Sequence, residues 1–408
     1  MTDEVSAFIE LQSFDRWGED FRSNYVTSGD ARAASVNDVE VTQAYIQMEN
    51  AWGHPLRLRI GRQDITLGKG WLVGETISPI LDISYDGVRA TWTEDTWNVD
   101  AIWAKLAENM AIEQDGDVDL YTLYGTYTGL EKMDVSLYWM FIRDALSLND
   151  TTGGFALEAA EELLGLDQYG NTNLHTFGAR FWGACQAWDY DLEVAYQTGD
   201  ADAVGFRFAN GVYGDDDAEF DSWAADLRLG YTFDTAWSPR VFFNAAYFDG
   251  EDNRDQGGFL HMLVGGPQAS VSFNRMFSSV NYSAIFDIVP TAEAISNFYK
   301  YQLGVTAKPT DKIALGANVA YLGVVDEFDV PVLGFWTKEA DDEIGVITQL
   351  SAGYTYSQDL SFKVLWEHLF AGEGLADGNY FSGNGLLFVG GRDDQDADYL
   401  QFYTSLKF

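Results

Sequence analysis

Two acidic runs have the side chains that could hold a divalent metal ion. Clustered carboxylates are the hard oxygen ligands that Ca²⁺ and Mg²⁺ prefer, although neither run has the spacing of an EF-hand loop. The candidate ligands are Asp215, Asp216, Asp217, Asp341, Asp342 and Glu343. We expect Ca²⁺ or Mg²⁺ there as an optional ligand, with no cofactor required. The alternative is a solvated acidic surface that aids solubility.

A second set of charged side chains recurs at alternate positions of segments whose other face is apolar. Arg57 and Arg59, for example, lie on the face opposite Leu58 in an extended chain. The set comprises Arg57, Arg59, Arg89, Arg180, Arg228, Lys300, Lys363, Asp189, Asp191 and Glu193. These side chains are predicted to line a wet pore. Arginine forks suit carboxylate and sulfate-like groups, so Arg57, Arg59 and Arg89 are expected to attract small anions such as organic acids or oxyanions. The alternative is a set of ion pairs that only satisfy buried charge.

The histidines and the cysteine content argue against catalysis. A hydrolase needs a nucleophile and a base within reach of each other. None of the four histidines lies in a Gly-x-Ser-x-Gly or His-Glu-x-x-His context. The single cysteine, Cys185, excludes an internal disulfide and a cysteine-based metal site. The sequence therefore predicts that the protein is not an enzyme.

The elements that would carry these side chains are β-strands. Sixteen segments of about ten residues alternate apolar and polar side chains with period two, which puts the two sets on opposite faces of a strand. The segments are 4–14, 39–51, 56–66, 83–92, 97–106, 119–128, 133–143, 174–183, 188–198, 222–233, 239–249, 298–308, 312–323, 344–356, 360–370 and 398–408. Each can cross a bilayer as a tilted strand, which takes roughly 9–11 residues.

The connections between these segments are alternately short and long, and both chain ends fall on the side of the short turns. An even number of strands with this alternation is typical of an outer-membrane barrel with short periplasmic turns and long extracellular loops. We therefore predict a single all-β domain over 1–408, a transmembrane antiparallel β-barrel of 16 strands. A soluble propeller or sandwich is the rival fold, but the chain has no repeat of about 40–50 residues.

The composition and charge of the chain exclude some classes of partner and of membrane segment. The chain has 408 residues and a net charge of −40, so nucleic acid is a poor partner. No run of about 18 apolar residues predicts a transmembrane helix. The first residues, Met1–Glu4, lack the features of a signal peptide. Either the protein is cytosolic, or the numbering starts at a mature or engineered end.

Two long connections have patterns of their own. Residues 155–164 in the connection 144–173 predict a short helix, which would constrict or cap a pore or pack on its rim. The longest connection, 250–297, contains the apolar stretch 259–264. Because exposed apolar patches of that size are uncommon, we expect this connection to plug the lumen or to pack against a neighbouring subunit.

Three stretches resemble a known family. They are the Gly-Arg-Gln sequence at 61–63, the stretch 301–316 with its Lys-Pro-Thr-Asp-Lys turn, and the terminal Phe408 with apolar residues at alternate positions before it. The first two resemble the alginate-export family of outer-membrane porins. The third is similar to the signal that the outer-membrane assembly machinery reads.

The resemblance implies a β-barrel in the outer membrane of a Gram-negative bacterium, in contact with membrane lipid and lipopolysaccharide. The exporter of that family is usually drawn with eighteen strands, which makes eighteen the alternative to sixteen. We expect a porin with a water-filled channel for passive diffusion of small hydrophilic solutes. The alternative function is dedicated export of an acidic polysaccharide such as alginate. Sixteen-stranded porins are commonly homotrimers, so the resemblance also implies a homotrimer.

Overall fold

The structure is a computed structural model, and its description covers most of the chain. The described residues are 4–13, 39–78, 81–108, 117–145, 171–201, 219–250, 270–286, 296–327, 329–332, 336–339, 341–377 and 395–407. Across these ranges, no helix has the length and apolar character needed to cross a membrane. The predicted helix at 155–164 and the apolar stretch 259–264 lie outside the described residues.

Sixteen long strands form one antiparallel sheet, in which each strand pairs with the next one along the chain. They are β1 (Val5–Ser13), β2 (Val39–Met48), β3 (Leu56–Gln63), β6 (Tyr85–Thr93), β7 (Trp97–Ala107), β8 (Val118–Tyr127), β9 (Met133–Asp144), β10 (Thr172–Cys185), β11 (Trp188–Asp200), β12 (Glu219–Thr232), β13 (Arg240–Phe248), β15 (Phe298–Thr310), β16 (Ile313–Val324), β19 (Glu343–Thr355), β20 (Leu360–Ala371) and β21 (Ala397–Leu406). Each overlaps one segment predicted from the alternation, so the all-β class and the strand count are confirmed.

The remaining described elements are short and lie in the connections. They are η2 (Ala51–Gly53), β4 (Thr76–Ser78), β5 (Leu81–Asp82), β14 (Ser270–Val271), β17 (Asp329–Val332), β18 (Trp336–Glu339) and α5 (Glu373–Asp377). Of these, β14 pairs in parallel with the start of β12 and so joins the main sheet. The pairs β4–β5 and β17–β18 are separate two-stranded sheets.

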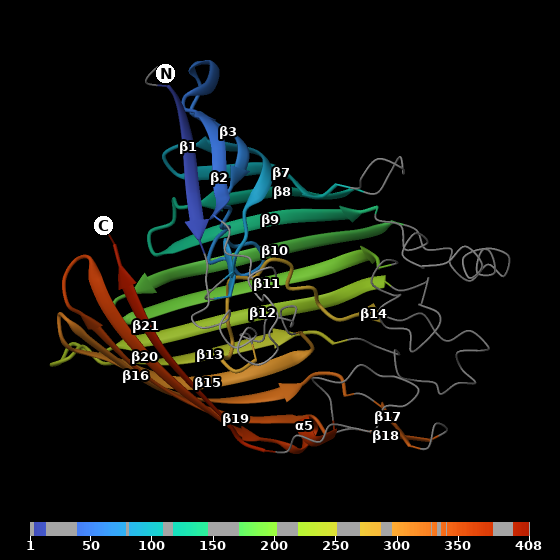
Figure 1. Cartoon of the computed structure of the whole chain (residues 1–408), viewed down its shortest axis with the longest axis vertical. Coiled ribbons are helices and arrows are strands. Elements are labelled where there is room, and N and C mark those ends of the chain that lie inside the picture. Colours follow the sequence, from blue (N-terminus) through green and yellow to red (C-terminus); the bar gives the residue numbers. More distant parts are fainter. Residues whose placement is uncertain are drawn as a thin grey trace, which may run out of the picture.

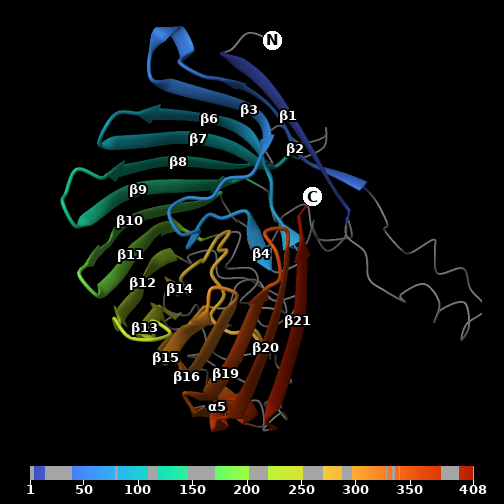
Figure 2. The same cartoon turned by 90° about the vertical axis from the view of Figure 1, so that its left-hand side faces the viewer.

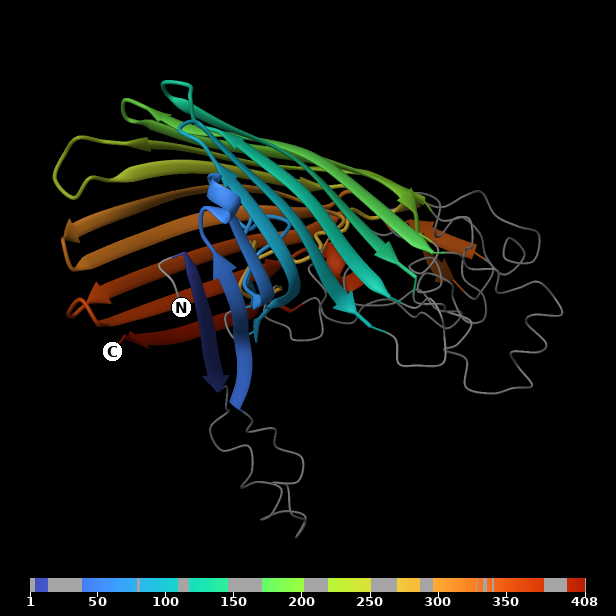
Figure 3. The ribbon, with the colours of Figure 1, turned by 90° about the horizontal axis from the view of Figure 1, so that it is seen from above.

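Short turns set the register of the hairpins at one end of the sheet. Between β10 and β11, only Gln186 and Ala187 separate the paired residues Cys185 and Trp188. Gln186 has a φ of 57°, the left-handed conformation that a two-residue hairpin turn requires. Figure 3 shows such turns on the same side as both ends of the chain, as the alternation of short and long connections predicts.

The sheet curves around a central space, which Figure 1 and Figure 2 show from two sides. In the described part of the chain its edge strands are β1, which pairs only with β2, and β21, which pairs only with β20. Within the described residues no ladder joins these two edges. The predicted number of strands is therefore right, whereas a hydrogen-bonded closure of the ring is absent from the described part.

The two faces of the sheet differ as the alternation predicts. On β9, Leu137 is 63 % exposed on the convex face, whereas its neighbours Ser136 and Tyr138 are buried on the concave face. On the edge strand β21, Leu400 is 72 % exposed in the same way. An apolar convex face fits a lipid-facing surface, and the polar side chains lie inside the curve.

The convex face carries a row of charged side chains at the end of the strands away from the short turns. Its members are direct cross-strand partners on five successive strands, so they lie at one level. We call them the outer charged row: Arg62, Asp86, Lys105, Asp119 and Arg143. The Arg62 guanidinium donates to Asp86 from Nε at 2.9 Å and from Nη2 at 2.7 Å. The Lys105 ammonium lies 3.0 Å from the Asp119 carboxylate.

A row of rings lies one pleat nearer the short turns on the same convex face. Its members are Trp103, Tyr121, Phe141 and His175, which are again direct cross-strand partners. The ring centroids are 5.9 Å apart for Tyr121 and Phe141, and 4.3 Å apart for Phe141 and His175. Rings in this position are typical of the aromatic girdle at a membrane interface.

Candidate functional site

Two connections fold back against the concave face instead of extending away from the sheet. They are residues 64–75 and 270–286, which we call the inner plug (Figure 2). Backbone hydrogen bonds join the two halves: Phe277 N donates to Leu72 O at 2.9 Å, and Ser279 N donates to Gly70 O at 2.8 Å. Trp71 is fully buried, with its ring centroid 5.8 Å from that of Phe248 on β13.

The inner plug adds a detail to one prediction and supports another. The sequence pattern predicted a long connection at 67–82, and its first residues fold inward and are buried against the sheet. Leu67, Trp71 and Leu72 are each less than 5 % exposed. Their apolar side chains leave water by packing on the concave face. The described part of the longest connection, 270–286, lies inside the curve, as the first of its two predicted positions requires.

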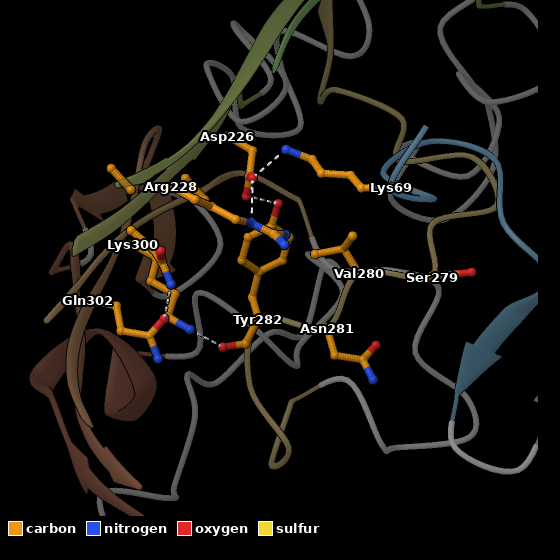
Figure 4. Close-up of a pocket in the computed structure, with 12 residues that line it drawn as sticks. Lys69, Asp226, Arg228, Ser279, Val280, Asn281, Tyr282, Lys300 and Gln302 are labelled. Atoms are coloured by element: carbon orange, nitrogen blue, oxygen red, sulfur yellow. Dashed lines mark hydrogen bonds and ion pairs between the residues drawn. The ribbon is translucent and has the colours of Figure 1, made fainter. Parts of the chain in front are cut away.

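One carboxylate on β12 holds both halves of the inner plug. Asp226 Oδ1 accepts from Lys69 Nζ at 2.6 Å and from Arg228 Nε at 3.0 Å, and its Oδ2 accepts from the Tyr282 hydroxyl at 2.7 Å (Figure 4). Burial raises the pKa of Tyr282 well above its usual value, with a further contribution from Asp226. The hydroxyl therefore stays protonated and remains a donor to the carboxylate.

A second carboxylate, on β20, holds the plug from the other side of the curve. Glu367 is 1 % exposed. Its Oε1 accepts from Ser283 Oγ at 2.6 Å and from Ile285 N at 3.1 Å. Its Oε2 accepts from Ala284 N at 3.2 Å and from Gln349 Nε2 at 2.9 Å. The plug segment 270–286 is thus bonded to β12 and to β20, which lie on different sides of the central space.

Around Asp226, the charged side chains of β10 and β11 are paired with one another and with the plug. The Arg180 guanidinium donates to Asp191 from Nε at 3.0 Å and from Nη2 at 2.7 Å. The Lys69 ammonium lies 3.5 Å from the Glu193 carboxylate. We call this cluster the ion-pair wall: Lys69, Arg180, Asp191, Glu193 and Asp226. The cluster has two cationic and three acidic side chains, and each contacts a group of opposite charge, which fits the alternative of ion pairs in the wall.

Asp189 is separate from this cluster, nearer the short turns. Arg240 on β13 donates to it from Nε at 2.9 Å and from Nη2 at 2.5 Å. This pair is more open to water, because the side chains of Asp189 and Arg240 are 43 % and 30 % exposed. It therefore forms part of the wetted inner surface.

The three arginines expected to attract anions lie together on the concave face of β3 and β6. Arg89 is paired with Asp100, through Nε at 2.8 Å and Nη2 at 3.1 Å. Arg59 instead donates to a neutral group, Gln47 Oε1, from Nε at 3.0 Å and Nη2 at 2.8 Å. Arg57 makes no hydrogen bond or ion pair with any described residue. Two of the three guanidinium charges are therefore not met by a directly bonded carboxylate in the described part of the chain.

Four carboxamide side chains form a further row on the concave face of β13, β15, β16 and β19. We call them the amide row: Asn244, Gln302, Asn318 and Gln349. Each donates to the next, with nitrogen–oxygen distances of 3.0 Å, 2.8 Å and 2.9 Å in that order. Gln349 then donates to Glu367, the carboxylate that holds the plug. Neutral side chains thus form a continuous part of the inner surface across these four strands.

Two cavities lie on this side of the central space. One, of about 420 Å³, lies under the plug, and its lining includes Lys69, Arg228, Asn244, Tyr282, Lys300 and Gln302 (Figure 4). The other, of about 520 Å³, lies towards the short turns, and its lining includes Arg240, Thr306, Lys308, Ser351 and Lys363. The predicted residues Arg228, Lys300 and Lys363 thus border open space. Lys300 is only 7 % exposed, and its ammonium donates to the Tyr282 carbonyl.

The candidate metal ligands divide between described and undescribed residues. Asp215, Asp216 and Asp217 lie outside the description. Asp341 Oδ1 accepts from Glu343 N at 2.9 Å, and Asp342 Oδ2 accepts from Tyr299 OH at 3.4 Å. Among the described residues, no three His, Cys, Asp or Glu side chains converge on a point where they could hold a metal ion. Binding of Ca²⁺ or Mg²⁺ stays a prediction.

Sequence reasoning missed the residues that the plug contributes. Lys69 and Tyr282 are absent from the predicted set because both lie in connections. There, no period-two alternation predicts which way a side chain points. A usable signal was present for the first of them. The stretch 65–73 contains Ile65, Leu67, Trp71, Leu72 and Val73, which is too apolar for a loop in water.

Comparison with known proteins finds one matching family and several similar solved structures. The alginate export family matches residues 1–329 of the chain. No curated protein matches the chain. Among solved structures, the chain is similar to OccD3 (OpdP) of Pseudomonas aeruginosa, with 13 % identity, a TM-score of 0.48, and coverage of 91 % of this chain and 79 % of that chain. It is also similar to OprD of the same organism, with 12 % identity, a TM-score of 0.49, and coverage of 90 % of this chain and 80 % of that chain. At these identities and scores, the likeness to solved structures carries no conclusion about function.

Proposed function

The chain belongs to the alginate export family, and from this premise we propose that it is a non-enzymatic porin for small hydrophilic solutes, among them small anions. It is an outer-membrane β-barrel channel of a Gram-negative bacterium. The observation that carries the proposed preference is the arginine group on β3 and β6. Arg59 is bonded to a neutral carboxamide, and Arg57 has no bonded partner among the described residues.

These arginines would act at short range, in the interior of the channel. The net charge of −40 repels anions from the protein as a whole. At physiological ionic strength, charges further apart than about 8 Å are largely screened. The acidic surface should therefore set mainly the rate at which anions arrive, and the side chains that a solute touches should set selectivity. Organic acids and inorganic oxyanions have the oxygen geometry that a guanidinium binds.

The inner plug supports small solutes over a polymer. It is bonded to β12 through Asp226 and to β20 through Glu367, so it crosses the central space. A long chain would have to displace both attachments, whereas small solutes can use the cavities beside the plug. Dedicated export of an acidic polysaccharide is the second candidate function, and the description of the matched family favours it.

Reversal potentials in planar bilayers test the proposal. In the double variant Arg57→Ala/Arg59→Ala, the ratio of anion to cation permeability should fall about fivefold. This corresponds to the loss of roughly 1 kcal/mol of attraction between a wall charge and a passing ion. Single-channel conductance should stay similar or rise, because the variant side chains are smaller.

Arg62→Ala is the matched control, because Arg62 lies on the convex face of the same strand and is paired with Asp86. It should leave the reversal potential unchanged. An unchanged potential in the double variant would mean that these arginines are structural and that other groups control permeation. A wild-type protein that inserts but never conducts would favour the closed exporter instead.

The assembly and its ligands are proposals of the same kind. We expect contacts with lipid and lipopolysaccharide, Ca²⁺ or Mg²⁺ at the acidic runs as an optional ligand, and the homotrimer implied by sixteen-stranded porins. Native mass spectrometry from mild detergent tests the last of these. A trimer mass is expected at protein concentrations where unrelated monomeric barrels stay monomeric. A monomer mass under the same conditions would refute the homotrimer.

A further inference from the structure

The amide row has hydrogen-bonding capacity that its own contacts do not use. A carboxamide offers two N–H donors and two acceptor lone pairs. Within the row, Gln302 and Asn318 each donate once and accept once. All four side chains are half-buried, so their remaining groups are open to the interior. Asn244 Oδ1 is not buried and has no partner among the described residues.

The backbone under the row is shaped so that the side chains can reach one another. Asn244 and Gln302 are direct cross-strand partners, and so are Asn318 and Gln349. The step from Gln302 to Asn318 is diagonal, because Asn318 lies opposite Gly304. A Cβ atom at Gly304 would clash with Phe242 Cζ and come within 2.6 Å of Asn318 Cβ, so a larger residue there would displace the ring or the asparagine. The glycine thus leaves room for both side chains beside the diagonal step.

The row also lies beside open space on both sides. Asn244 and Gln302 line the cavity of about 420 Å³ under the plug, next to the ring of Tyr282. Two residues beyond Gln349 on the same face, Ser351 lines the cavity of about 520 Å³. Both volumes fall in the range of roughly 300–1,000 Å³ that small-molecule sites occupy. A solute that passes between these cavities would move along the carboxamides.

The chemistry of the spare groups selects a class of solute. A row that offers N–H donors and carbonyl acceptors side by side matches hydroxyl groups, which both donate and accept. A carboxylate only accepts hydrogen bonds, so it would be repelled by the carbonyl oxygens of the row. An ammonium only donates, so it would be repelled by the N–H groups. We propose that the amide row is a binding strip for neutral polyhydroxylated solutes, such as sugars and sugar alcohols. This deepens the proposed channel function, on which its transport role rests.

Direct binding tests the strip without requiring the channel to conduct. The full chain is purified in lauryldimethylamine oxide, a detergent without a sugar head group. Saturation-transfer NMR then measures the affinity for sorbitol. Asn318→Leu removes the central donor and acceptor at nearly constant volume, and it should weaken sorbitol binding about three- to tenfold, as expected for one or two neutral hydrogen bonds. Asn318→Ala should give the same loss if the leucine variant does not fold.

Gln401→Leu is the matched control, because Gln401 is a carboxamide on the same face of β21 but bonds to no member of the row. It should bind sorbitol like the wild type. Absence of sorbitol binding in the folded wild type, or equal binding in the wild type and both Asn318 variants, would overturn the strip. Conductance of the same preparation is measured separately. If the protein conducts but does not bind sorbitol, the channel function holds and the binding strip is refuted. If it binds sorbitol but does not conduct, the binding strip holds and the channel function is refuted.

Discussion

The ion-pair wall and the amide row are neighbours on the same concave face, yet they use their polar groups in opposite ways. In the ion-pair wall, Lys69 and Asp226 have side chains only 8 % and 3 % exposed, and each contacts a group of opposite charge. In the amide row, Gln302 and Asn318 are neutral and keep part of their bonding capacity free. The charged groups of the first region contact one another, whereas the second region keeps donors and acceptors that a solute could use.

This difference follows from what burial does to each kind of group. An unpaired charge away from water is strongly unfavourable, so a buried carboxylate such as Asp226 must have partners. Once it has them, it becomes a strong anchor for another segment, here the inner plug. A carboxamide is less demanding, because water can replace a lost partner at small cost. The comparison predicts that equivalent truncations in the two regions differ several-fold in their effect on stability.

The largest effect is expected for Asp226→Ala. The substitution leaves Lys69 and Arg228 without their nearest carboxylate and frees the Tyr282 hydroxyl. Removing one partner of a buried ion pair typically costs about 3–5 kcal/mol. The free energy of unfolding, measured by urea titration in lipid, should fall by about that amount. Asp189→Ala removes the more open partner of Arg240 and should cost less than about 1 kcal/mol. Equal losses would mean that burial does not distinguish the two carboxylates.

A smaller effect is expected for Glu367→Gln. The new side chain keeps one acceptor oxygen for one of the Ala284 and Ile285 N–H groups, but it turns an N–H group towards the other. The loss should be about 1–3 kcal/mol, as for a buried donor left unsatisfied. The plug segment 283–286 also loses part of its attachment to β20, so the single-channel current should become larger and noisier. Asp86→Asn, whose carboxylate accepts from Arg62 on the convex face, is the control and should leave the current unchanged. A current that stays wild-type in Glu367→Gln would show that this attachment does not hold the plug in place.

The smallest effect is expected for Gln302→Ala. It interrupts the amide row between Asn244 and Asn318, but water from the adjacent cavity can replace the lost partners. The free energy of unfolding should change by less than about 1 kcal/mol. If this variant were as unstable as Asp226→Ala, the amide row would be a structural clamp like the ion-pair wall, and the comparison between the two regions would fail.

Local pattern was enough to predict the strands and their faces. The alternation of side chains over each segment places Arg180 and Asp191 inside, and the two-residue turn at Gln186 and Ala187 fixes the register that brings them together. The inner plug could not be derived in the same way. Lys69 meets Asp226 across 157 residues of sequence, and no local rule specifies such a contact. The position of a long connection depends on which of its side chains it can bury, and this depends on the surface of the folded sheet.

The outer charged row indicates how deep the protein sits in its membrane. A charged side chain that faces the middle of the hydrocarbon layer costs about 2–4 kcal/mol, and the cost disappears towards the interface. Arg62 and Lys105 face outwards at one level, and the ring of Tyr121 lies one pleat below, where aromatic side chains prefer to be. A displacement by that pleat, about 7 Å along a strand, would move five charged groups into lipid. A displacement that carries the row into lipid is therefore opposed on each of these strands.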